Sequence, residues 1–280
     1  MIIWLASYPK SGNTWIRALL SSYLYSDGKF NFDLLNKIDS FPSEKFFKNY
    51  PDKFENPVDT TKYWLKEQEK MNQSKDVTFL KTHNALCKIN QSSFTNSENT
   101  LGAIYIIRDP RNVITSIAHH YQISKKEALD FMLDEKRGII SKVDNRYIGF
   151  QALFSWILNQ KSWVENKNFP VLTVRYEDLQ SETFKTFKKV IDFINKLTNS
   201  KKIIDREKAK KSIKSCDFEN LKRLEKEKGF AEAITKKGSD EKIKFFNLGI
   251  NNNYKNLLDP ILLTKMNDLF QAELVKYNYE

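Results

Sequence analysis

Short apolar runs separated by longer amphipathic segments dominate the hydrophobic pattern of the chain. The runs are too short for helices and rich in branched and aromatic residues, which favours buried strands; they cover residues 2–7, 77–83, 102–108 and 171–176. Helical spacing covers residues 14–24, 111–121, 125–135, 149–164, 181–196, 201–213, 218–228 and 260–277. Strands that alternate with helices predict an α/β fold with three layers, a parallel sheet flanked by helices on both faces.

The length and the continuity of this pattern predict one domain over residues 1–280. Two segments depart from it. Residues 26–76 are polar, aromatic and punctuated by prolines, and we expect loops and short helices that form an insertion beside the substrate. Residues 234–244 are rich in lysine and are predicted to form a solvated, mobile loop.

The formal net charge of +11 permits an anionic partner, but the lysines are scattered along the whole chain. Basic residues interleaved with exposed aromatics along one stripe, as a nucleic-acid binder would need, are not found, so we expect no nucleic acid partner. Two cysteines, Cys87 and Cys216, and three histidines offer no disulfide or metal-binding spacing. No targeting segment or membrane-spanning run is recognised, and a cytoplasmic protein is expected.

The first candidate site is SYPKSGNTW, residues 7–15, between a predicted strand and a predicted helix. A loop that contains Gly12 there directs backbone N–H groups and a positive helix end toward an anion. Lys10 adds a positive charge, Thr14 a hydroxyl and Trp15 an aromatic face. The loop departs from the pattern GxxxxGK[ST], because its lysine precedes the glycine. A bare KSG would indicate only an ordinary strand-to-helix turn.

Two further segments gain meaning beside this loop. Arg108 ends a strand and Ser116 lies in the following helix, so both could hold one phosphate, for which a planar guanidinium is suited. His83 ends the strand that carries LKTH, at the edge where parallel sheets bind ligands, and imidazole can accept a proton near neutral pH. Taken alone, Arg108 would indicate a salt bridge, Ser116 a small buried residue and His83 a surface histidine.

Together these segments resemble the PAPS-dependent sulfotransferase family, whose fold is related to that of P-loop kinases. PAPS is 3′-phosphoadenosine 5′-phosphosulfate, and PAP is its desulfated product. Residues 7–15 are similar to the family's loop for the 5′-phosphosulfate, and Arg108 and Ser116 match its pair for the 3′-phosphate. Residues 81–83 (KTH) resemble its catalytic element, and residues 175–179 (RYEDL) its tyrosine-bearing strand end near the adenine.

The resemblance implies sulfuryl transfer from PAPS to a hydroxyl or amine, giving PAP, with no metal. His83 is then the general base, Lys81 supports the sulfuryl group, Lys10 stabilises the leaving oxygen, and Ser116 tethers Lys10 until an acceptor binds. Trp15 and Tyr176 would contact adenine. The residues implied to hold the donor are Lys10, Ser11, Gly12, Asn13, Thr14, Trp15, Arg108, Ser116, Tyr176 and Gly249. Residues 26–76 would face a small-molecule, glycan or lipid acceptor, and residues 229–256 would form a mobile loop over the donor.

One late segment, residues 245–256, departs from the family pattern. It keeps Gly249 but has Asn247 and Leu248 where the family has two cations for the 3′-phosphate. Either donor binding is weak or another cation compensates, and we expect partial compensation by Lys244 or Lys255, which are close in sequence.

Two other functions remain open at this stage. A P-loop-type kinase for a small molecule would need an acidic magnesium ligand after a strand, but Asp109 and Asp178 open helices instead. A sulfotransferase-like binding protein without activity would be compatible with the altered late segment, although Lys10, His83, Arg108 and Ser116 are all present.

Overall fold

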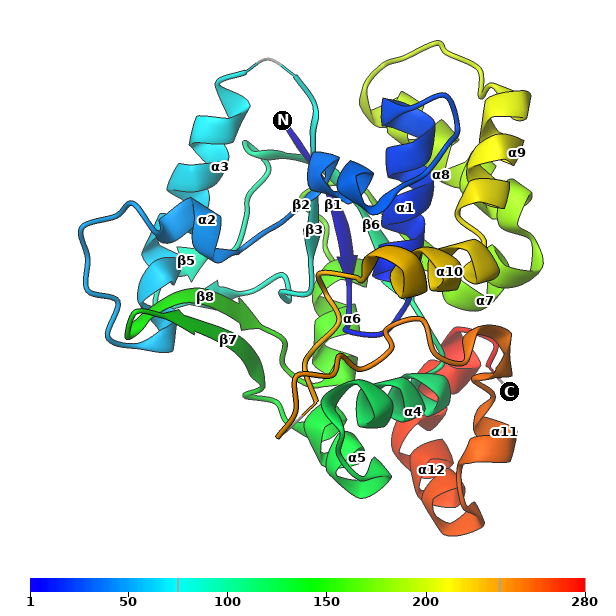
Figure 1. Ribbon diagram of the computed structural model, residues 1–280. Helices are drawn as coiled ribbons and strands as arrows, with labels where there is room; N and C mark the ends of the chain where they lie inside the picture. Colours follow the sequence, from blue (N-terminus) through cyan, green and yellow to red (C-terminus); the bar gives the residue numbers. More distant parts are fainter. Residues whose placement is uncertain (75, 237, 280) are drawn as a thin grey trace.

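The computed structural model describes residues 1–74, 76–236 and 238–279. Within these residues a parallel sheet of five strands, in the order β2-β3-β1-β6-β9, forms the centre of the molecule (Figure 1). Its strands are β1 (Ile2–Ser7), β2 (Asp39–Ser40), β3 (Thr78–Thr82), β6 (Thr100–Ile107) and β9 (Val171–Arg175). The predicted α/β class with a parallel sheet between helices is confirmed.

Side chains of β1 alternate between two apolar cores, one on each face of the sheet. Trp4 and Ala6 lie in one core, whereas Ile3 and Leu5 lie in the other, and all four are fully buried. The first core is covered by α4 (Pro110–Tyr121), α5 (Lys125–Leu133), α6 (Trp156–Val164) and α12 (Pro260–Lys276), and the second by α1 (Asn13–Tyr25), α8 (Thr183–Leu197), α9 (Arg206–Ser215) and α10 (Phe218–Lys228). A strand buried on both faces reads as one continuous apolar run, which explains the pattern of IIWLAS.

The strand register brings the candidate site residues together. Ala6 of β1 lies beside Thr82 of β3, and Ser7 lies beside Ile106 of β6. Because these strands are parallel, their carboxyl ends meet at one edge of the sheet. The residues that follow these strands, including His83 and Arg108, therefore lie at the same edge of the sheet.

The predicted helix over residues 149–164 is wrong in its first half. A hairpin of β7 (Gly138–Val143) and β8 (Arg146–Ala152) stands there, and α6 begins only at Trp156. The turn residues Asp144 and Asn145 have φ values of 47° and 62°, the conformation of a tight hairpin turn. An Asp-Asn pair before alternating aromatic and aliphatic residues was the available signal.

Residues 26–76, predicted to be an insertion beside the substrate, hold short helices, as predicted, and also strand β2 of the central sheet; many aromatic side chains in this range are structural. Phe41, Phe47, Phe54 and Trp64 are buried in the first core. The remaining elements of this range are η1 (Phe32–Lys37), α2 (Glu44–Phe47), η2 (Pro57–Tyr63) and α3 (Trp64–Asn72), and the rest of the chain adds β4 (Lys88–Ile89), β5 (Ser92–Ser93), α7 (Tyr176–Ser181), η3 (Gly249–Asn251) and α11 (Tyr254–Leu257). Among the described residues, no helix is both long and apolar enough to cross a bilayer.

Candidate active site

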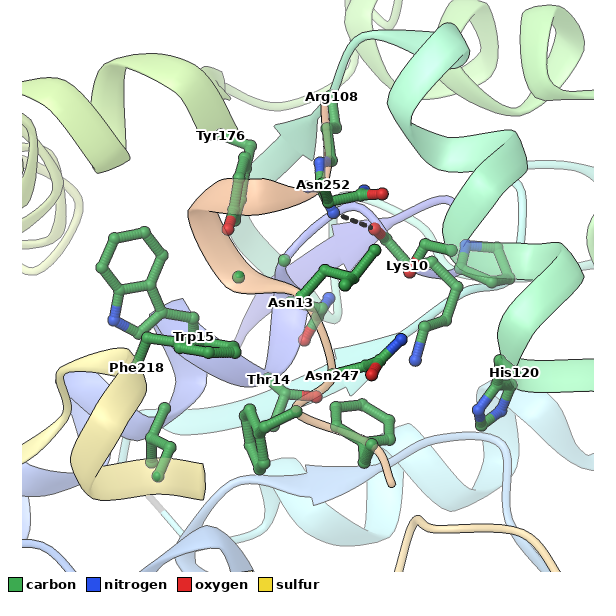
Figure 2. Close-up of a pocket in the computed structure, with 18 of the residues that line it drawn as sticks. Lys10, Asn13, Thr14, Trp15, Arg108, His120, Tyr176, Phe218, Asn247 and Asn252 are labelled. Atoms are coloured by element: carbon green, nitrogen blue, oxygen red, sulfur yellow. Dashed lines mark hydrogen bonds between the residues drawn. The ribbon is translucent and has the colours of Figure 1, made fainter. Parts of the chain in front are cut away.

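A cavity of about 730 Å³ opens at the carboxyl edge of the sheet. Figure 2 shows side chains from the loop after β1, the end of β6, α4, α7 and the late segment converging on it. Of the residues predicted for the site, Ser11, Lys244 and Lys255 do not line this cavity, and the others do: Lys10, Gly12, Asn13, Thr14, Trp15, Lys81, His83, Arg108, Ser116, Tyr176 and Gly249. The structure thus brings these residues together around one cavity.

The loop between β1 and α1 is held in an anion-receptive shape. Lys10 has φ 66° and Gly12 has φ 99°, and a Cβ atom on Gly12 would lie 2.4 Å from the Tyr176 ring. The Asn13 side-chain amide donates to the Leu5 carbonyl at 2.9 Å and fixes the helix start to the strand. Gly12 caps α1 without a side-chain hydrogen bond, and the Trp15 N–H donates to the Gly12 carbonyl at 3.1 Å, so the N–H groups of Asn13 and Thr14 are the ones directed at a ligand.

Lys10 extends its side chain into the cavity. Its Nζ lies 3.7 Å from the centre of the Phe245 ring, a cation–π contact. Burial lowers the pKa of Lys10 to about 7, since the attraction of Glu232 offsets only part of the desolvation and the charges of Lys81 and Arg108 lower the pKa further. An anion placed beside Lys10 would restore its full charge.

Arg108, which follows β6, contacts the loop through its side chain. Its Nη1 donates to the Lys10 carbonyl at 3.2 Å (Figure 2), and its guanidinium lies 4.1 Å from the centre of the Tyr176 ring. Trp15 packs against Tyr176 in an edge contact with 5.7 Å between ring centres. The buried Nε of Arg108 and Oγ of Ser11 have no partner among the described residues. Arg108 also lines the cavity, whereas Ser11 does not, so only the Arg108 guanidinium can face a ligand there.

His83 is oriented by the end of β1. Its Nδ1 lies 2.8 Å from the Ser7 carbonyl oxygen, and because a carbonyl only accepts, Nδ1 carries the proton. The basic nitrogen of the neutral ring is therefore Nε2. Burial and the charge of Lys81 lower the pKa of His83 to about 3, so the ring is neutral at physiological pH. Bound phosphate charges would raise this pKa toward the range useful for a base.

Ser116 lines the cavity from α4. The predicted tether between Ser116 and Lys10 is not formed among the described residues, because Lys10 lies over Phe245 instead. One turn further along α4, His120 also lines the cavity, and the sequence reasoning missed it. Its spacing of four residues from Ser116, which places both on one helix face, was the available signal. Burial and the charge of Lys10 lower the pKa of His120 to about 3.

A buried ion cluster beside the loop was also missed. The carboxylate of Glu232 accepts from Arg17 Nη1 at 2.6 Å, from Lys81 Nζ at 3.1 Å and from Thr14 Oγ1 at 3.3 Å. Burial alone raises the pKa of Glu232, but the charges of Lys81 and Arg17 outweigh it and lower the pKa to about 2. Glu232 is separated from Arg17 by 215 residues, so no local pattern announces the contact.

The late segment closes the cavity opposite the loop. Gly249 has φ 55°, and a Cβ atom there would lie 2.6 Å from the Phe218 ring. Asn252 accepts from Thr115 Oγ1 at 2.6 Å, which ties the segment to α4. Asn247 and Leu248 line the cavity without bringing a charge. Lys244 and Lys255, in contrast, are exposed and do not line it, so the expected compensation by one of them finds no support.

No group of three or more His, Cys, Asp or Glu side chains in the described parts of the chain could hold a metal ion. The polar groups that converge on the cavity are mostly donors and cations, a set suited to oxyanions. The arrangement can therefore bind a phosphorylated ligand and present the neutral imidazoles of His83 and His120 to it.

Comparison with known proteins decides the family. A sulfotransferase domain model matches residues 2–278. The chain belongs to the sulfotransferase family. The family prediction made from the sequence motifs is confirmed.

Curated relatives cover nearly the whole chain. A luciferin sulfotransferase of Photinus pyralis is 23% identical over 279 residues, which is 94% of this chain and 69% of the relative. A flavonol 3-sulfotransferase of Flaveria bidentis is 26% identical over 289 residues, which is 97% of this chain and 81% of the relative.

Solved structures share the fold of this sulfotransferase. Retinol dehydratase, solved with androsterone and PAP, has a TM-score of 0.59 at 16% identity, covering 98% of this chain and 80% of that chain. The mouse sulfotransferase SULT7A1, solved with PAP, has a TM-score of 0.56 at 18% identity, covering 99% and 85%.

Proposed function

We propose that the protein transfers a sulfuryl group from PAPS to a hydroxyl or amine of a small acceptor, releasing PAP. The observation that carries this proposal is the neutral imidazole of His83 beside the helix start and Lys10, in one cavity. The family match and the PAP in related structures support the choice of donor.

The donor lies along the wall of the cavity in this proposal. The N–H groups at the start of α1 hold the 5′-phosphate, and Arg108, with its unpaired buried Nε, binds the 3′-phosphate together with Ser116. Trp15 and Tyr176, whose rings already pack together, contact the adenine. Gly249 brings the backbone of the late segment close to the nucleotide.

The transfer is direct. A lone pair of the acceptor oxygen or nitrogen attacks the sulfur, and the bond from sulfur to the 5′-phosphate oxygen breaks. Nε2 of His83 takes the acceptor's proton, while Lys10 stabilises the negative charge that develops on the leaving oxygen. Lys81 stabilises the sulfuryl group while it is transferred. No metal ion takes part in this scheme.

Small organic molecules are the proposed acceptors. The names of two relatives specify luciferin and a flavonol, and one structural neighbour was solved with androsterone. The cavity, which extends to Ser40 of the insertion and Ile139 of β7, offers room for such a molecule beside His83. A cytoplasmic location and the assignment of residues 229–256 as a mobile loop over the donor remain predictions.

Transfer of labelled sulfur from PAPS to a panel of phenols, steroid alcohols, sugars and amines tests the activity. In parallel, thermal shifts should show stronger stabilisation by PAP than by ATP, which lacks the 3′-phosphate. Arg108→Ala should weaken PAP binding by about tenfold to a hundredfold and remove most of this preference. Lys255→Ala, which removes an exposed cation outside the cavity, is the matched control and should bind PAP like the parent.

Equal shifts for ATP and PAP, together with magnesium-dependent phosphoryl transfer, would favour the kinase alternative. PAP binding without transfer to any acceptor would favour a binding protein that lacks activity. If Arg108→Ala bound PAP as tightly as the parent, the assignment of the 3′-phosphate would be wrong.

A further inference from the structure

Three donors from two separate elements converge on one carboxylate in the cavity wall. Thr14 and Arg17 belong to α1, and Lys81 belongs to β3. Arg17 Nη1 and Lys81 Nζ both donate to Oε1 of Glu232, at 2.6 Å and 3.1 Å, and Thr14 Oγ1 donates to Oε2 at 3.3 Å. The donors thus form a receptor for an oxyanion, and a side chain of the protein itself fills it.

Arg17 is fixed independently of Glu232. Its Nε donates to the Ile38 carbonyl at 2.7 Å and its Nη2 donates to the Leu35 carbonyl at 2.8 Å. These neutral carbonyls orient the guanidinium but supply no opposite charge. A buried guanidinium and a buried ammonium need an anion close by, because an uncompensated charge in a protein interior is costly. Any anion of suitable size can meet that need.

The carboxylate is the accessible member of the cluster. The side chains of Arg17 and Lys81 are 7% and 9% exposed, whereas that of Glu232 is 28% exposed. Thr14, Lys81 and Glu232 line the cavity and Arg17 does not, so Glu232 reaches Arg17 from the cavity side. It is carried by the stretch between α10 and η3, outside any regular helix or strand. Withdrawal of Glu232 would open the receptor without moving α1 or β3.

Lys81 is already assigned to the sulfuryl group of the donor; we propose that Arg17 joins Lys81 and Thr14 in this subsite, and that Glu232 occupies the subsite until the sulfuryl group takes its place. The proposal rests on the proposed function. Thr14 belongs to the loop assigned to the 5′-phosphate, and Lys81 precedes the proposed base by two residues on the same strand end. An anion between them lies where the group passed from the phosphate to the acceptor would be.

The exchange gives the protein a way to distinguish PAPS from PAP. PAPS has to displace Glu232 and gains the contacts of three donors in return. PAP lacks the sulfuryl group, so Glu232 stays in or returns to the subsite when PAP is bound. Arg17 then becomes a binding residue for the donor, a role that its position one turn beyond the loop does not announce.

Calorimetric titration of PAPS and PAP, without acceptor, tests the exchange in the parent and in two variants. Glu232→Gln removes the charge of the internal competitor, and Glu232→Asp keeps the charge but shortens the reach. Both should raise affinity for PAPS relative to PAP, Glu232→Gln by about tenfold, the value of one lost charge-assisted contact. Arg17→Lys, which loses the fixed fork, should lower relative affinity for PAPS.

Glu219→Gln is the charge-matched control. Glu219 lines the cavity but is exposed, and no contact with Arg17 or Lys81 is found for it. Its substitution should strengthen PAPS and PAP binding equally, leaving their ratio unchanged. Thermal melting without nucleotide checks that each variant is folded.

An unchanged ratio in both Glu232 variants would overturn the exchange and leave Glu232 as a permanent counterion. If Glu232→Gln alone raised the ratio, with Glu232→Asp like the parent, the charge and not occupancy of the subsite would be responsible, and the exchange would also fail. Failure of the proposed donor looks different, because the parent protein would then bind neither PAPS nor PAP.

Discussion

One wall of the cavity is built from neighbouring strand ends, whereas the opposite wall is built from Glu232 and residues 245–252, where the structure describes η3 and otherwise irregular chain. In the first wall, backbone pairing of β1, β3 and β6 fixes where the side chains start. In the second, position depends on side-chain contacts such as those of Glu232 with Arg17 and of Asn252 with Thr115. The sheet therefore fixes the side chains of the first wall, whereas the proposed exchange of Glu232 concerns contacts of the second wall.

The difference also appears in charge. The strand-end wall carries Lys10 and the buried cations Lys81 and Arg108, while the opposite wall brings the Glu232 carboxylate, Asn247, Asn252 and the rings of Phe245 and Phe246. The cations of the strand-end wall attract a phosphorylated ligand whatever the position of the opposite wall. The late wall adjusts how tightly each ligand is held.

The largest expected effect concerns the base in the strand-end wall. His83→Ala should lower turnover by about two to four orders of magnitude, because no other group would take the acceptor's proton at that position. PAP binding should change little, since His83 lies toward the acceptor. Steady-state kinetics with PAPS and any acceptor identified in the panel measures this.

His83→Gln is the matched variant, because its amide can still donate to the Ser7 carbonyl but cannot accept a proton at neutral pH. Turnover should be equally low in both variants. If turnover recovered in His83→Gln, His83 would only support the loop, and the strand-end wall would not carry the base.

The predictability of the two walls from sequence follows the same contrast. Residues 7–15, Arg108 and His83 could be placed in advance, because ends of parallel strands meet at one edge whatever the details of packing. The Asp-Asn turn of the hairpin after α5 was overlooked because a helical pattern covered its second strand. Glu232 could not be found, since its partners lie 151 and 215 residues away and no periodicity connects them.

The second prediction concerns Lys10 and pH. Burial lowers its pKa to about 7, and a bound phosphate should raise that pKa. Protonated Lys10 is the form that binds PAP. The affinity for PAP should therefore be highest below pH 7 and should fall as the pH rises above 7. The fall should be at most about tenfold per pH unit and should end at the pKa that Lys10 has in the complex. Titrations between pH 6 and 9, in buffers of different ionisation enthalpy, measure both affinity and proton uptake.

Lys10→Arg separates Lys10 from its neighbours, because arginine stays protonated throughout this range. The slope of affinity against pH should flatten in this variant. If the slope persisted, Lys81, whose pKa burial also lowers, would be the titrating group instead. His83 and His120 have pKa values near 3 in the free protein, so they would contribute to a slope above pH 7 only if the bound nucleotide raised those pKa values above 7.

The smallest expected effect tests whether the late wall can be strengthened. Asn247 lines the cavity at a position where the family pattern has a cation for the 3′-phosphate. Asn247→Arg should therefore raise PAP affinity by about five- to tenfold, the contribution of one partly solvated charge-assisted contact. AMP, which has no 3′-phosphate, should gain much less. The gain should shrink as salt is raised, since part of the attraction is screened.

Asn251→Arg adds the same charge to the same segment, but Asn251 is exposed and does not line the cavity. Equal gains from the two substitutions would mean that net charge alone is responsible. Equal gains for PAP and AMP would mean that Asn247 faces another part of the nucleotide. A gain specific to Asn247 and PAP would show that the late wall tolerates a stronger grip, and that its present asparagine keeps PAP binding weaker than this fold permits.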